Sequence, residues 1–135
     1  MSIVVNEFGK NAGMVWDVLH KQGALSQILL GKETKLDEHQ LHAAIGWLAR
    51  ENKVSKKGNG YELKETNLTE KIGGDAGRVW RVLETWGDLD VSSLIRVTQL
   101  NESDVFSALG WLARENKIDT KIGLSRDGQI RYQLK

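Results

Sequence analysis

Residues 46–53 read Gly-Trp-Leu-Ala-Arg-Glu-Asn-Lys, and residues 110–117 repeat this string letter for letter. The register that aligns Gly46 with Gly110 matches further pairs without a gap, such as Val15-Trp16 with Val79-Trp80. Self-similarity at a fixed period is the mark of a duplicated structural unit. The sequence therefore predicts one small domain present twice, copy one at residues 1–65 and copy two at residues 66–135.

The composition is that of an ordinary globular protein, with 27% charged and 40% hydrophobic residues. Cysteine is absent, which excludes disulfides and thiolate metal sites. No apolar run approaches the length of a membrane span, and the first residues do not form a signal peptide. We therefore expect a cytoplasmic protein without a membrane partner. The net charge of +1 favours neither a nucleic-acid partner nor its absence.

The apolar pattern predicts the same order of elements in each copy: a short strand, three helices and a β-hairpin. In copy one, the β-branched residues 3–5 suit the strand, and we expect Asn11 to cap a first helix over residues 12–21. Ser26 is the expected cap of a short second helix.

Asp37 is expected to cap the third helix of copy one, with Gln40 at the spacing of a capping box. Asn52 can close that helix in the left-handed conformation. The dipeptide Asn59-Gly60 then predicts a tight two-residue turn in the hairpin, because its central residues need positive φ.

Copy two repeats this order, with Asp75, Asp90 and Asn101 as the expected caps of its three helices. Its hairpin is longer, with strands over residues 118–124 and 129–134 and a turn near residues 125–128. No proline-rich or Ser/Gly-rich linker separates the copies, so we expect a nearly rigid pair.

Each copy contains a short helix, two leucines six positions apart, a capping residue, a long helix and a basic hairpin. The leucines and caps are Leu30, Leu36 and Asp37, and Leu94, Leu100 and Asn101. This arrangement resembles the winged helix-turn-helix. The repeated string is similar to one in an uncharacterised winged-helix family of bacteria and archaea, whose members usually have a single domain. One departure is Lys35 and its equivalent Gln99, where many helix-turn-helix proteins place a glycine.

The resemblance implies an α+β, mainly α fold of two tandem winged helix-turn-helix domains. Each domain would have three helices and a hairpin wing, and its third helix would be the recognition helix, which can read bases in the major groove. The side chains expected to point outward from these two helices are Glu38, His39, His42, Ala43 and Gly46, and Glu102, Ser103, Phe106, Ser107 and Gly110. None is Arg or Lys, so His39, His42 and Ser103 are the candidates for hydrogen bonds to bases.

Basic side chains collect on the hairpins, where they could rest on phosphates without reading sequence. They are Lys53, Lys56, Lys57 and Lys64 in copy one, and Lys117, Lys121, Arg126 and Arg131 in copy two. Exposed hairpins also use lysine for solubility and to block edge pairing, and this alternative stays open.

The repeated string itself is expected to be structural. Trp47 and Trp111 lie beside the buried stripe of the third helix, which favours packing against the first helix or the hairpin over base stacking. The mid-helix Gly46 and Gly110 are expected to admit a close neighbour, with Trp16 or Trp80 as candidates. Arg50 with Glu51, and Arg114 with Glu115, suit surface ion pairs.

Among the differences between the copies are apolar replacements of polar residues: Trp86 replaces Gln22, Phe106 replaces His42, and Val91 replaces Gln27. If these apolar side chains are exposed, Trp86 and Phe106 are candidates for an interface between the domains or with a partner. A locally repacked core is the alternative.

His39 and His42 lie three positions apart, but copy two has no histidine and nothing completes a metal site. No phosphate loop or activated nucleophile is recognisable. We therefore expect no metal, no cofactor and no enzymatic activity. Two interpretations remain: weak, wing-led binding of double-stranded DNA in a transcription-associated protein, or a protein-interaction or scaffolding module that binds a partner or self-associates.

Overall fold

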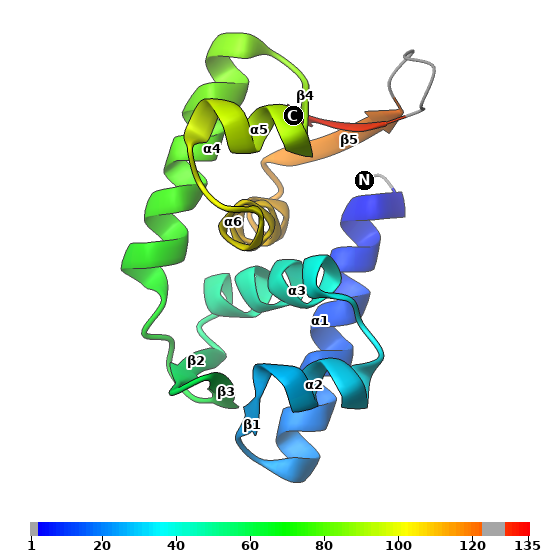
Figure 1. Cartoon of the computed structure of the whole chain (residues 1–135), viewed down its shortest axis with the longest axis vertical. Coiled ribbons are helices and arrows are strands. Elements are labelled where there is room, and N and C mark those ends of the chain that lie inside the picture. Colours follow the sequence, from blue (N-terminus) through cyan, green and yellow to red (C-terminus); the bar gives the residue numbers. More distant parts are fainter. Residues whose placement is uncertain (1–2, 123–128) are drawn as a thin grey trace.

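The computed structural model describes residues 3–122 and 129–135. Apart from a π-helical turn that opens copy two, both copies have the same order of helices and strands (Figure 1). Copy one comprises α1 (Ile3–Gln22), β1 (Leu25–Ser26), α2 (Gln27–Thr34), α3 (Glu38–Arg50), β2 (Val54–Lys57) and β3 (Gly60–Leu63). Copy two comprises the π-helical turn η1 (Thr69–Gly73), α4 (Gly74–Trp86), β4 (Leu89–Asp90), α5 (Val91–Thr98), α6 (Glu102–Arg114), β5 (Ile118–Ile122) and β6 (Ile130–Leu134).

A small antiparallel sheet closes each copy, with strand order β1-β3-β2 in copy one and β4-β6-β5 in copy two. Leu25 pairs with Tyr61, and Leu89 pairs with Tyr132 at the matching place. The β2–β3 pair is the first hairpin and the β5–β6 pair is the second hairpin. The strands of the second hairpin are longer than those of the first, as expected. Its predicted turn lies outside the described residues.

Four predicted caps are confirmed, because each side chain accepts a hydrogen bond from the backbone three positions later. These are Ser26 from Leu29, Asp37 from Gln40, Asp90 from Ser93, and Asn101 from Asp104. The Gln40 side chain also accepts from the Asp37 N–H, which completes the capping box. These bonds set where the second and third helices begin.

The start of copy one differs from the prediction. Residues 3–5 form no strand, and Asn11 caps nothing: α1 begins at Ile3, and Asn11 is buried within it. Apolar residues with helical spacing begin at Val5 and Phe8 and continue into the predicted helix, so one long helix buries them better than a separate strand would.

The caps at the start of copy two also differ from the prediction. Asp75 lies in the first turn of α4 and makes no cap, because η1 leads directly into that helix. Its carboxylate instead pairs with Lys71 Nζ at 2.8 Å. An acidic side chain in the first turn of a helix is still favourable toward the helix dipole.

The turn of the first hairpin lies one position earlier than expected. Gly58 and Asn59 form it, and only Gly58 has positive φ, at 57°. Gly60 belongs to β3, where a side chain would overlap the carbonyl group of Leu25 on β1. The glycine there serves the close approach of β1 rather than the turn.

The helix-turn-helix linkers use the left-handed conformation without glycine. Lys35 and Gln99 both have φ 60° at the end of the second helix of each copy. Asn52 closes α3 with φ 61°, as predicted, and Asn116 does the same after α6 with φ 60°. The matching angles show that the turn geometry is retained in both copies despite the missing glycine.

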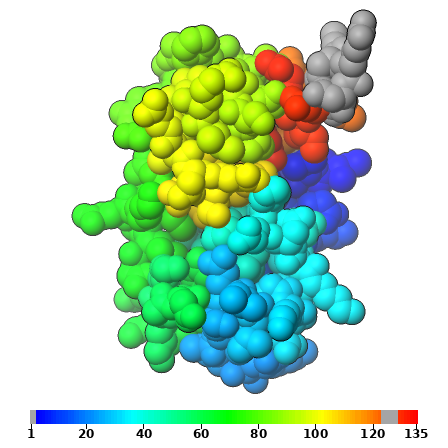
Figure 2. Space-filling model, in the orientation of Figure 1, coloured from blue at the N-terminus to red at the C-terminus, as the bar shows by residue number. Residues whose placement is uncertain are grey.

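The two hydrophobic cores cross the boundary between the copies. Val5 and Phe8 of α1 pack into the core of copy two, whereas Leu68 and Ile72 pack into the core of copy one. Phe8 and Ile72 occupy equivalent positions of the repeat, so the leading segments of the copies are exchanged reciprocally. The space-filling view shows the two copies in broad contact (Figure 2). The boundary between residues 65 and 66 stays a prediction, since neither core is confined to one copy.

Candidate interaction surfaces

The third helices of the two copies pack directly on each other at the centre of the molecule (Figure 1). A Cβ added to Gly46 would overlap the carbonyl oxygen of Ser107, and one added to Gly110 would overlap that of Ala43. The close neighbour of each glycine is therefore the backbone of the other third helix. The expected neighbours, Trp16 and Trp80, do not fill these places.

This packing buries much of the face that was expected to point outward. His42 and Ser107 are only 8% and 7% exposed, and Ala43 is fully buried. Gly46 and Gly110 are buried as well. The prediction of an outward orientation was wrong at these positions, because a face that is free on an isolated winged helix is covered here by the other copy.

Arginine and glutamate of the repeated string pair between the copies rather than within them. Arg50 Nε lies 3.1 Å from Glu115 Oε2, and Arg114 Nε lies 3.0 Å from Glu51 Oε2. The expectation of Arg50–Glu51 and Arg114–Glu115 pairs was therefore wrong. Each arginine reaches over the opposite third helix because the glycines bring the helix backbones together.

The tryptophans of the repeated string line the same contact. The Arg50 guanidinium lies 5.8 Å from the Trp111 ring centroid, and Arg114 lies 6.0 Å from that of Trp47, within cation–π range. Trp47 packs against both cores, as does Trp111. A Cβ on Gly9 of α1 would lie 3.0 Å from the Trp47 ring. The predicted packing against the first helix is confirmed for Trp47; the neighbour of Trp111 is Gly73, at the end of η1.

His39 and Phe106 join the copies near the start of α3. Their rings stack with centroids 4.6 Å apart and planes 8° from parallel, and His39 Nε2 pairs with Glu102 of α6. Phe106 thus contacts the other copy and also packs against the core of copy two. Its role as a site of interaction with a partner stays a prediction. His39 contacts the other copy, and about half of its side chain stays exposed to solvent.

His42 makes a contact inside copy one that copy two does not repeat. Its Nε2 lies 3.3 Å from Nε2 of Gln27 on α2, and burial lowers the pKa of His42 below its ordinary value of 6.5. The Glu38 carboxylate opposes this shift but does not reverse it. Ser103, the third candidate for contact with bases, is half-buried on α6.

Most basic side chains of the hairpins have an acidic or aromatic neighbour. The ion pairs are Lys53–Glu51 (3.7 Å), Lys57–Glu62 (3.6 Å), Lys117–Glu115 (3.5 Å), Lys121–Asp88 (3.1 Å) and Arg131–Asp88 (2.7 Å). Lys56 lies over the Tyr61 ring, 5.0 Å from its centroid. Hydrogen bonds from Arg131 and then Lys121 hold the pKa of Asp88 below its usual value, so this carboxylate stays charged beside them.

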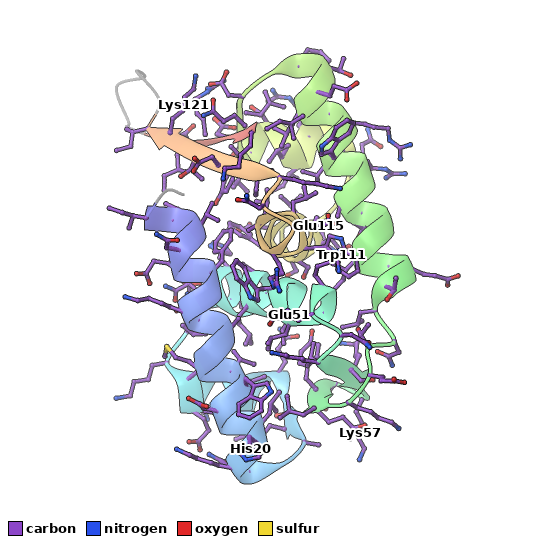
Figure 3. The ribbon with its side chains drawn as sticks, turned by 180° about the vertical axis from the view of Figure 1, so that it is seen from behind. His20, Glu51, Lys57, Trp111, Glu115 and Lys121 are labelled. Carbon is purple, nitrogen blue, oxygen red and sulfur yellow. The ribbon has the colours of Figure 1, made fainter. Side chains whose placement is uncertain are left out.

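Two predicted cations are not part of this pattern. Within the described ranges, Lys64 has no ion pair, and Arg126 lies outside those ranges. Lys57 and Lys121 lie at opposite corners of the molecule (Figure 3). These two cations, one on each hairpin, are therefore far apart on the molecule.

Several large apolar side chains remain exposed. Trp86, at the end of α4, is 64% exposed, and Ile3, Ile28 and Ile122 are exposed to a greater extent. Ile122 pairs across the second hairpin with Ile130, and α1 contacts β5. The differences between the copies pointed to Trp86 but not to the isoleucines. The isoleucines lie in a strand with alternating apolar residues or near the start of a helix, where an apolar residue normally belongs to the core.

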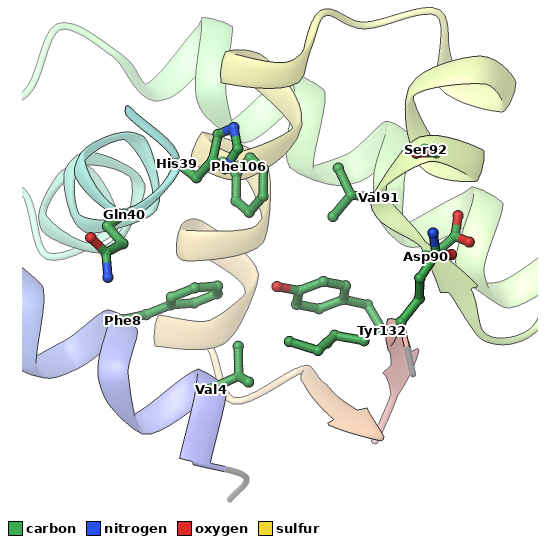
Figure 4. A pocket seen from close by; sticks show the side chains of 11 residues that line it. Val4, Phe8, His39, Gln40, Asp90, Val91, Ser92, Phe106 and Tyr132 are labelled. Carbon is green, nitrogen blue, oxygen red and sulfur yellow. The ribbon is translucent and has the colours of Figure 1, made fainter. Parts of the chain in front are cut away.

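A cavity of about 350 Å³ opens beside the second hairpin (Figure 4). Its walls come from the start of α1, the start of α3, the start of α5, α6 and β6. Val91 and Phe106, two of the apolar replacements seen in the sequence, both line it. The differences between the two copies were thus the feature of the sequence that pointed to residues of this cavity.

The described residues hold no group of three or more His, Asp or Glu arranged for a metal ion. None of the helices described is both long and apolar enough to cross a membrane.

The helix order, the αL turn between the second and third helices and the three-stranded sheet with its hairpin define a tandem winged helix-turn-helix protein. The family model described as winged helix-turn-helix domain (DUF2582) matches the chain twice, at residues 4–64 and 67–131. The chain belongs to this family and carries its domain in duplicate. No curated protein and no solved structure matches the chain.

Proposed function

We propose that this chain is a non-enzymatic protein-interaction module, in which the recognition helices hold the two domains together instead of reading DNA. The observation that carries the proposal is the packing of α3 on α6 through Gly46 and Gly110. A recognition helix must enter the major groove. Here the stretch of each helix that follows its first turn is buried against the other domain, at Ala43 and Gly46 of α3 and at Ser107 and Gly110 of α6.

Electrostatics supports the same conclusion. The exposed residues at the start of α3 and α6 include Glu38 and Glu102, which would meet phosphates with the wrong sign. Binding led by the hairpins would need free cations to displace counterions from DNA. Lys57 and Lys121 are instead engaged with Glu62 and Asp88.

The exposed apolar side chains supply the positive argument. Trp86 protrudes at one place, and Ile3, Ile122 and Ile130 are exposed near the start of α1 and the second hairpin. Exposed tryptophan and clustered aliphatic side chains are characteristic of protein interfaces. The partner expected is a protein with a complementary apolar surface.

The DNA interpretation is tested by titrating a fluorescent random duplex at low salt with the wild-type chain and with Lys56→Ala/Lys57→Ala. We expect binding no tighter than millimolar and no difference between the two proteins. Micromolar binding would overturn the proposal if log K falls with log salt at a slope of about −4 to −5 and the double variant flattens that slope by up to about 2.

The protein interpretation is tested with a photo-crosslinking amino acid placed at Trp86 or at Ile122 in cells, with Lys10 on α1 as the control position. Lys10 is also exposed, but it is charged and lies outside the apolar surfaces. We expect a discrete cross-linked protein from Trp86 or Ile122 and none from Lys10. The same products at all three positions, or none at any of them, would count against the module.

A further inference from the structure

The cavity beside the second hairpin has the dimensions of a small-molecule site. Its volume of about 350 Å³ lies at the lower end of the range for ligand pockets, roughly 300–1,000 Å³. Val4, Phe8, Val91 and Phe106 give it apolar walls (Figure 4). Such a pocket binds a ligand mainly through apolar contact, with few polar groups to orient it.

One buried polar group turns into this cavity. Tyr132 is only 3% exposed, and its hydroxyl points toward the ring of Phe8 across the pocket (Figure 4). None of the described residues forms a hydrogen bond with this hydroxyl. Burial raises the pKa of Tyr132 to about 12, so the hydroxyl stays protonated at neutral pH and can both donate and accept.

Copy one has a polar pair at the equivalent place. There Gln27 and His42 stand for Val91 and Phe106, and their side-chain nitrogens lie 3.3 Å apart in a hydrogen bond. In copy two both residues are apolar, so the hydrogen-bonded pair is absent and the two side chains form part of the hydrophobic wall of the cavity. The two replacements do not fill the space beside them, because Val91 and Phe106 both line the cavity.

The charges around the cavity restrict the ligand further. Of its described lining residues, His39 is paired with Glu102, and Asp90 is engaged as the cap of α5 by the Ser93 N–H. A buried ion needs an opposite charge or several hydrogen bonds. The lining therefore favours an uncharged ligand, and the aromatic rings of Phe8 and Phe106 favour a flat one.

From this geometry we infer that the cavity binds one small, uncharged aromatic molecule that carries a hydrogen-bonding group, which pairs with the Tyr132 hydroxyl. The inference does not depend on the proposed protein interaction. It assigns a ligand site to copy two alone.

The test uses N-phenyl-1-naphthylamine, a neutral aromatic probe with a single N–H, whose fluorescence rises in apolar surroundings. Titration of the full chain should give saturable binding of one probe per chain. The matched probe 8-anilinonaphthalene-1-sulfonate has the same rings plus a negative charge, and it should bind at least about 10-fold more weakly. Equal or tighter binding of the sulfonate would overturn the assignment of an uncharged ligand.

Two variants locate the site. Val91→Gln/Phe106→His installs the polar pair of copy one and should weaken binding of the neutral probe more than about 10-fold. Tyr132→Phe keeps the ring and should weaken it about 2- to 10-fold, the range of one hydrogen bond. Ile28→Ser, at an exposed position of copy one, is the control and should leave the affinity unchanged.

Unfolding curves in urea show whether each variant is folded at the titration temperature. If Val91→Gln/Phe106→His is unfolded, the affinity of Tyr132→Phe alone decides the test. A non-saturable signal, or equal affinity of the wild-type chain and Tyr132→Phe, would overturn the inference.

Discussion

Arg50 Nε donates a hydrogen bond of 3.1 Å to Glu115 Oε2, and the equivalent atoms of Arg114 and Glu51 repeat this bond at 3.0 Å. The arginine of each repeated string thus pairs with the glutamate of the string in the opposite copy. A contact in which residue i meets j and j meets i is that of a two-fold symmetric dimer. The two domains are therefore joined as the subunits of such a dimer would be, within one chain.

Gly46→Ala tests the close approach of α3 and α6. The added methyl group would overlap the Ser107 carbonyl, so the helices must separate, and we expect a loss of about 2–3 kcal/mol or more in the free energy of unfolding. Urea denaturation followed by tryptophan fluorescence measures it. Gly13→Ala on α1 is the control, because its methyl group meets nothing within 4 Å and should stabilise the helix by up to about 1 kcal/mol. A neutral Gly46→Ala would mean that the helices do not touch here.

A double-mutant cycle on Arg50 and Glu115 tests the ion pair between the copies. Both side chains are partly exposed, so we expect a coupling energy of about 0.5–1 kcal/mol that diminishes in high salt. The cycle on Arg114 and Glu51 is an internal replicate and should give the same value. Coupling of Arg50 to Glu51 that exceeds its coupling to Glu115 would contradict the observed pairing.

Trp47→Ala tests whether the tryptophan of the repeated string is structural. Its ring lies against Gly9 and contacts both cores, so truncation should cost about 3 kcal/mol or more and lower the denaturation midpoint. Trp86→Ala is the matched control, since that ring is 64% exposed, and its loss should change stability by less than about 0.5 kcal/mol. Comparable losses of stability from Trp47→Ala and Trp86→Ala would contradict a structural role that is specific to Trp47.

His42 makes stability depend on pH near neutrality. Because burial lowers the pKa of His42 in the folded protein, the unfolded chain binds the proton first as the pH falls below about 6.5. The contribution of His42 to the free energy of unfolding should be fully present above that pH. It should fall as the pH drops toward the folded-state pKa of His42 and stay constant below that pKa. The lowered pKa values of Asp88 and Asp90 act only at more acidic pH.

The measurement for His42 is urea denaturation at pH 7.5, 6.5 and 5.5. His42→Phe places the side chain of Phe106 in copy one and should remove most of the slope between pH 7.5 and 5.5. An unchanged slope in this variant would assign the pH dependence to other groups.

Local chemistry was sufficient for the sequence to predict the duplication and the winged helix-turn-helix class of each copy. The constant register between the two copies identified the duplication, and the side chains of Ser26, Asp37, Asp90 and Asn101 marked helix starts through bonds that span only three positions. Signals of this kind depend on neighbours in the chain or on self-similarity, so one sequence is enough to recognise them.

The sequence could not show how the domains meet. Gly46 and Gly110 indicated a close neighbour, but the backbone that fills the space beside Gly46 belongs to Ser107, far along the chain in the other copy. The same limit explains why Arg50 was paired with Glu51 in prediction and with Glu115 in the structure. Periodicity separates the two faces of a helix; it does not say what covers each face.

Tertiary structure also decided the meaning of the differences between the copies. The sequence showed that Phe106 and Val91 replace His42 and Gln27, and left an interface and a repacked core as alternatives. In the fold, Phe106 stacks on His39 of the other copy and lines a cavity with Val91 at the same time. Whether an apolar side chain fills a core, an interface or the wall of a pocket depends on the space left by segments distant in sequence, and only the packed chain determines that space.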